Sequence, residues 1–148
     1  MYMVRKLFYS IFLLGLLNNS TYAETCSILM IYDDKIQTII DNNSFEFKGY
    51  DRVCRQLKQA NAGINITTGS AINERQTTAV AVIRLQDTKL PIPGGNTRSS
   101  MWSSPLRTTK NQDALIWSAI NEATSAINQS DIDGLNENRK KLGFKTYP

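Results

Sequence analysis

The 148-residue sequence contains no histidine. The Ser–His–Asp and Cys–His arrangements that activate nucleophiles are therefore unavailable, and the commonest general acid–base group is missing. Metal sites with cysteine ligands usually recruit histidine or further cysteines, and this chain has only two cysteines. The composition therefore disfavours most small hydrolases, and we expect neither a metal site nor a cofactor.

The chain also lacks an apolar run long enough to cross a bilayer. Its longest such run, residues 7–17 (LFYSIFLLGLL), has eleven residues, whereas a spanning helix needs roughly 20 and the core of a signal peptide only about 7 to 15. Arg5 and Lys6 supply the positive charge that precedes a signal-peptide core. The segment predicts export rather than a stable membrane anchor.

Two small residues, Thr21 and Ala23, stand at the third and first positions before a possible cleavage site, where signal peptidases accept small side chains. We therefore predict a signal peptide over residues 1–23 and a single exported domain over residues 24–148, periplasmic or secreted. An uncleaved anchor is the less favoured alternative because no stop-transfer segment follows.

An excess of one charge is also missing. The formal net charge is +4, and removal of Arg5 and Lys6 with the leader leaves 15 basic against 13 acidic residues. A nucleic-acid partner calls for a concentrated basic surface, so we expect none. Nothing in the sequence fixes the oligomeric state.

Both cysteines, Cys26 and Cys54, fall in the part predicted to be exported. A pair of cysteines in an oxidising compartment predicts a disulfide. A redox role would favour a close CxxC pair, and these two residues are 28 positions apart.

Apolar spacing predicts helices over residues 26–41 and from about 45 or 49 to 62, and again from 113 to about 128 and from 130 to 142. Between them, β-branched residues and a polar turn at 73–76 predict a hairpin with Ala79, Ala81, Ile83 and Leu85 facing the core. The predicted fold class is α+β: two N-terminal helices, a β-hairpin or small antiparallel sheet, a long loop over residues 88–110, and two C-terminal helices.

The predicted loop carries the most informative composition. It contains no acidic residue between Asp87 and Asp113. Tryptophan and arginine often supply binding energy at protein interfaces, so we predict that the loop binds a partner with an acidic surface. Alternatively, Trp102 packs on the domain and the basic residues only keep the loop solvated. The candidate partner-binding residues are Lys89, Arg98, Met101, Trp102, Arg107 and Lys110.

We assign no catalytic residue. The carboxylates Glu46, Glu74 and Glu122 are scattered on predicted solvent faces, and Arg139, Lys140 and Lys141 are interpreted as cations that complement a helix dipole. The predicted function is that of a small exported protein-binding protein, either an inhibitor or immunity-type antagonist or an accessory subunit of an envelope assembly. The alternative is a secreted enzyme or toxin that acts on cell wall or glycan through carboxylates, which would place two of them in one deep cleft.

Overall fold

The computed structural model describes residues 26–148. The predicted signal peptide lies outside the described residues. The elements in chain order are β1 (Met30–Ile31), α1 (Asp34–Asp41), α2 (Tyr50–Gln59), β2 (Ala62–Ile72), β3 (Thr77–Asp87), β4 (Pro93–Ser104), α3 (Thr109–Ser125) and α4 (Gln129–Lys141).

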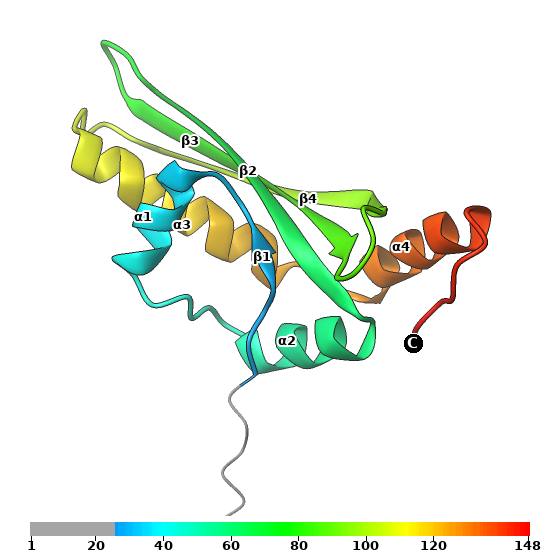
Figure 1. The fold of residues 1–148 in the computed structure, drawn as a ribbon. Helices are drawn as coiled ribbons and strands as arrows, with labels where there is room; N and C mark the ends of the chain where they lie inside the picture. Colours follow the sequence, from blue (N-terminus) through cyan, green and yellow to red (C-terminus); the bar gives the residue numbers. More distant parts are fainter. Residues whose placement is uncertain (1–25) are drawn as a thin grey trace, which may run out of the picture.

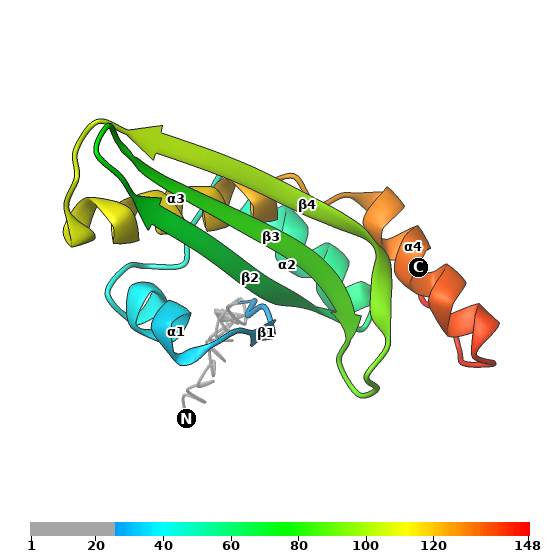
Figure 2. The same ribbon diagram turned by 90° about the horizontal axis from the view of Figure 1, so that it is seen from above.

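The strands form one mixed sheet in the order β1-β2-β3-β4, with β1 parallel to β2 and the other neighbours antiparallel. The helices lie on one side of this sheet (Figure 1). Seen from the sheet face opposite to the helices, the three long strands lie in front of α2 and α3, and no described element covers them (Figure 2). The domain therefore has two layers, and one sheet face remains open.

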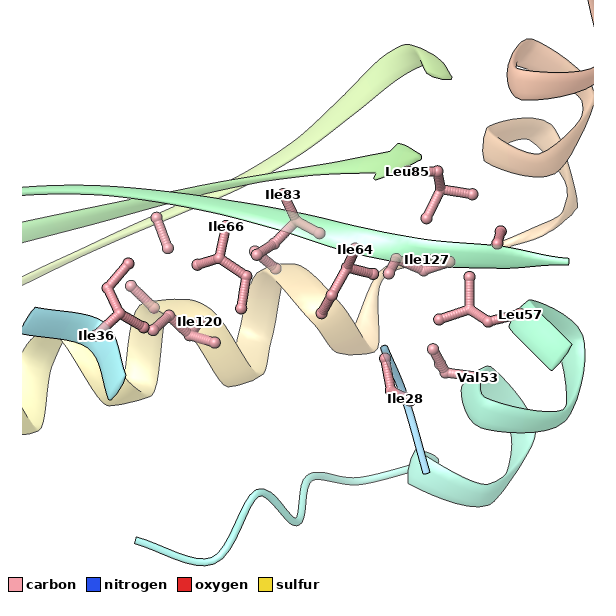
Figure 3. Packing of buried hydrophobic residues seen from close by; sticks show 14 of the residues in the cluster. Ile28, Ile36, Val53, Leu57, Ile64, Ile66, Ile83, Leu85, Ile120 and Ile127 are labelled. Carbon is pink, nitrogen blue, oxygen red and sulfur yellow. The ribbon is translucent and has the colours of Figure 1, made fainter. Parts of the chain in front are cut away.

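The core lies between the sheet and the helices, and strict alternation along β3 builds it. Ala79, Ala81, Ile83 and Leu85 are at most 2% exposed, as the sequence predicted. The side chains that meet this face come from β2, from the helices and from the connection between α3 and α4 (Figure 3), among them Ile64, Ile66, Val53, Leu57, Ile120 and Ile127.

The domain is α+β, but the predicted arrangement of two N-terminal helices, then a hairpin or small sheet and a long loop, is wrong. The chain enters the sheet as β1 before its first helix begins. Only the second half of the predicted 26–41 helix is helical, because Asp33 caps α1 by accepting a hydrogen bond from the Ile36 amide at 3.0 Å. A cap breaks a helix pattern without interrupting its apolar spacing.

The predicted loop over residues 88–110 is also wrong, since most of it forms the twelve-residue strand β4. Thr97 is the only β-branched residue in this strand, so local propensity gave no signal for it. Pairing with β3 along its length supplies the structure instead. Pro93 stands at the first position of the strand, where a missing backbone donor is tolerated.

The predicted disulfide is confirmed. Cys26 and Cys54 are bonded, and their Cα atoms are 6.0 Å apart. The bond joins the segment before β1 to α2, and the Tyr50 hydroxyl donates a hydrogen bond to the Cys26 carbonyl oxygen at 3.0 Å. Among the described residues, no helix combines the length and the apolarity needed to cross a bilayer.

Arg139 is not the solvated helix-end cation that the sequence suggested. Its side chain is fully buried, and Nη2 lies 2.6 Å from Asp87 Oδ2. Nη1 donates to the Ala60 carbonyl oxygen at 2.9 Å and Nη2 to that of Asn61 at 2.9 Å. The neighbouring Lys140 and Lys141 are exposed in the last turn of α4, as the dipole interpretation requires.

Replacing Cys26 and Cys54 together by serine should lower the free energy of unfolding by roughly 3 to 4 kcal/mol, because the bond closes a loop of 28 residues in the unfolded chain. Urea titration of the oxidised protein and the double variant measures this difference. The wild type unfolded in reductant is the control and should match the variant. Equal stability of the oxidised protein and the variant would contradict this role for the disulfide.

The ion pair between Arg139 and Asp87 allows a second test. Burial opposes ionisation of Asp87, but hydrogen bonds from the Lys89 amide, from Arg139 and from the Leu90 amide outweigh it, so the pKa of Asp87 lies below its usual value of 3.8. A carboxyl group with a lowered folded pKa stabilises the fold above its unfolded pKa, and that contribution is lost as pH falls through the folded pKa.

Asp87→Asn should therefore lower the free energy of unfolding by roughly 3 to 5 kcal/mol near neutral pH, because it leaves the buried Arg139 charge without a counter-ion. The difference in this free energy between wild type and variant should become smaller as pH falls below 3.8. Urea unfolding at a series of pH values measures both effects. Asp113→Asn, at an exposed position in α3, is the matched control and should stay within about 0.5 kcal/mol of wild type. A gap that is constant with pH would contradict the assignment.

Candidate functional site

The six predicted partner-binding residues lie in different places. Lys89 lies in the turn between β3 and β4, whereas Arg107 and Lys110 follow β4 at the opposite end of the sheet. Eleven residues of β3 separate these ends, which is about 36 Å at roughly 3.3 Å per residue. The four cations therefore do not form one continuous basic surface.

Two of these cations, Arg98 and Arg107, make hydrogen bonds to other residues of the domain. Arg98 Nε donates to both carboxylate oxygens of Asp131, at 3.0 and 2.9 Å, and its Nη2 donates to Ser130 Oγ at 3.0 Å. Arg107 Nη1 donates to the Glu74 carbonyl oxygen at 2.8 Å. Arg98 therefore fastens α4 to β4, and Arg107 fastens the β2–β3 turn to the segment before α3.

Met101 and Trp102 are adjacent on β4 and consequently point to opposite faces of the sheet. Met101 pairs with Val80 on the open face and is 72% exposed. Trp102 pairs with Ala79, whose side chain is in the core, and its indole Nε1 donates to Glu122 Oε2 on α3 at 2.7 Å. The strand therefore contributes to two distinct surfaces.

The open face of the sheet is almost free of charge. Alternation and strand register place the residues named below on it, and Arg84 is the only charged one among them. A hollow of about 360 Å³ crosses it where Arg84, Thr67 and Val82 meet. We define the open face by these residues: Asn65, Thr67, Gly69, Ala71, Thr78, Val80, Val82, Arg84, Gln86, Thr97, Ser99, Met101 and Ser103.

A second surface lies on the helical side, where Trp102 meets α3 and the segment before α2. Glu122 Oε2 accepts hydrogen bonds from Ser100 Oγ at 2.5 Å and from the Trp102 indole at 2.7 Å. These two bonds hold the pKa of the Glu122 carboxyl below its usual value of 4.5. A hollow of about 440 Å³ opens beside them, lined by Phe47, Lys48, Trp102, Ser118, Asn121, Glu122 and Ser125.

The third surface adjoins the disulfide. A hollow of about 650 Å³ there is lined by Cys26, Phe45, Phe47 and Tyr50, together with the carboxylates Glu46 and Asp51. Both carboxylates are exposed, and neither side chain makes a hydrogen bond within residues 26–148. Catalytic carboxylates need fixed positions, so this shared hollow gives only weak support to a glycan-acting enzyme.

The other carboxylates considered from the sequence lie apart. Glu74 stands in the turn between β2 and β3, and Glu122 has no second carboxylate lining its hollow. No group of three or more potential metal-binding side chains gathers within the described part of the chain.

Sequence reasoning proposed Met101 and Trp102 as candidate binding residues but did not indicate the residues that they contact. Arg84 could have been found, because it is the only charge on the outward-facing positions of a predicted strand. No local signal connects Ser100 or Trp102 with Glu122, since the contact needs β4 to be a strand packed on α3.

Comparisons with protein-family models, with characterised proteins and with solved structures find no match, so function must be inferred from this geometry.

The carboxylate of Glu122 should titrate below pH 4.5, because the Ser100 and Trp102 hydrogen bonds stabilise its ionised form. The proton shift of the Trp102 indole N–H, followed by NMR between about pH 2 and pH 7, reports this titration. Ser100→Ala should move the midpoint upward. Glu122→Gln is the control and should remove the titration, whereas a wild-type midpoint at or above 4.5 would contradict the geometry.

Proposed function

We propose that the protein is exported and acts by binding another protein through the open face, as an inhibitor, an immunity-type antagonist or an accessory subunit of an envelope assembly. The observation that carries this proposal is a broad sheet face that no described element covers and that holds a single charge. Depletion of charged residues marks the centres of protein interfaces.

The size of the open face suits such a role. Three strands of about eleven residues give a surface of roughly 36 by 14 Å, or about 500 Å². A typical stable interface buries about 800 Å² on each partner. The open face would therefore supply more than half of an interface of that size, and the adjoining turns would supply the rest.

The chemistry of the partner follows from the side chains. Met101, Val80 and Val82 offer apolar contacts along the middle of the open face, and Arg84 offers a guanidinium group at one end. Arginine recognises carboxylates with two parallel hydrogen bonds. We therefore expect a partner with an apolar ridge and an acidic side chain opposite Arg84, which keeps the acidic partner expected from the sequence but moves its recognition to a different arginine.

The disulfide supports the exported location, because such bonds persist in oxidising compartments. The alternative of a glycan-acting enzyme has one supporting observation, the hollow shared by Glu46 and Asp51. Without hydrogen bonds to orient them, these two exposed carboxylates support it less than the open face supports protein binding.

The experiment is capture of a partner from periplasmic extract, with mass-spectrometric identification and measurement of affinity. Met101→Glu should weaken binding at least tenfold, about 1.4 kcal/mol, because it places a negative charge on an apolar contact. Met101 is 72% exposed, so the variant should fold. Gln59→Glu adds the same charge at an exposed position of α2 and should bind like wild type.

Arg84→Glu should weaken capture of the same partner and restore it when the partner's acidic residue is replaced by lysine. Unchanged affinity in both Met101→Glu and Arg84→Glu would exclude the open face as the interface. Self-association of the pure protein that Met101→Glu abolishes, with no second protein captured, would instead identify another copy of the chain as the occupant.

A further inference from the structure

The hollow beside Trp102 lies on the side of the sheet opposite to the open face. It forms where β4, α3 and the segment before α2 meet, and its volume of about 440 Å³ falls within the range of roughly 300 to 1,000 Å³ found for small-molecule sites. Its lining combines two aromatic rings, a carboxylate, an amide, hydroxyl groups and one lysine.

Trp102 is held in place but not covered. Its indole N–H donates to Glu122 Oε2 at 2.7 Å, yet the residue remains 43% exposed. A tryptophan exposed in a fixed orientation presents a broad apolar surface at little further entropic cost. Phe47 lines the same hollow.

Unused acceptors lie beside this aromatic surface. Glu122 Oε2 receives two hydrogen bonds, whereas Oε1 receives none from residues 26–148. Asn121 also lines the hollow, and its Oδ1 is buried without a hydrogen-bond partner in the described chain. Burial of an unpaired acceptor is unfavourable, and a ligand that donates a hydrogen bond to it removes this cost.

These features select one class of ligand. An apolar ligand would leave the acceptors unpaired, and a cation would meet Lys48 in the same hollow. A sugar ring has an apolar C–H face that can lie on an indole, and each of its hydroxyl groups both donates and accepts hydrogen bonds. It therefore suits Glu122 as an acceptor and Asn121 in either orientation of its amide.

We infer that this hollow binds a neutral saccharide, with one pyranose ring stacked on Trp102 and its hydroxyl groups hydrogen-bonded to Glu122 and Asn121. We expect binding without cleavage, because most glycosidases use a pair of carboxylates and Glu122 is the only carboxylate that lines this hollow. The inference does not depend on the proposed protein partner, since the two surfaces lie on opposite sides of β4.

The test is an NMR titration of the full exported domain with chitotetraose, cellotetraose and maltotetraose, each up to about 10 mM, where even a millimolar dissociation constant is detected. At least one of these sugars should shift the Trp102 indole signal and the amide signals of Asn121 and Glu122. The Trp117 indole is the internal reference, because Trp117 packs against Phe45 outside the hollow.

Trp102→Ala should abolish the binding, and Trp102→Phe, which keeps a ring but loses the donor, should retain part of it. Glu122→Gln should weaken it at least tenfold. Met101→Glu, on the opposite face, should bind the sugar like wild type, so failure here and failure of the proposed protein interface are separable. The inference is overturned if no sugar shifts the Trp102 signal, or if Trp102→Ala binds as tightly as wild type.

Discussion

The buried guanidinium of Arg139 joins parts of the chain that are far apart in sequence. It contacts the Asp87 carboxylate at the end of β3 and the Ala60 and Asn61 carbonyl oxygens between α2 and β2. Its Cζ lies 4.7 Å from the centre of the Tyr147 ring. A buried ion pair adds little net stability relative to apolar side chains of the same shape. Its consequence is positional, because these partners meet only when α4 lies in one place.

The position of α4 in turn determines the course of β4. The two elements approach closely, since a Cβ atom added at Gly95 would lie 3.4 Å from the Gly134 carbonyl oxygen. Arg98 and Asp131 add an ion pair at 2.9 Å along the same contact. A strand made mainly of serine, glycine and asparagine has little intrinsic preference for extended structure. Packing against α4 on one side and pairing with β3 on the other hold β4 in the extended conformation that its sequence does not favour.

Sequence reasoning succeeded where local pattern and tertiary environment agree. The apolar alternation of β3 predicted its core face, and the only two cysteines predicted the disulfide. It failed for β4, where pairing overrides propensity, and for Arg139, because a cation in the last turn of a helix has the same local pattern whether it is solvated or buried. Composition proposed Met101 and Trp102 as candidates but could not place them on opposite faces, since that placement follows from a strand that the pattern did not indicate.

The register of β4 is the constraint that keeps the two proposed surfaces apart. Side chains alternate along a strand, so a slip by one residue would turn Trp102 to the open face and Met101 towards α3. Arg98 shares the helical side with Ser100 and Trp102 and reaches Asp131 only from there. The hydrogen bonds of Ser100 and Trp102 to Glu122 impose the same register two and four residues further along. Three side chains at alternate positions, one bound to Asp131 on α4 and two to Glu122 on α3, therefore fix the register of a strand whose composition alone would permit it to slip.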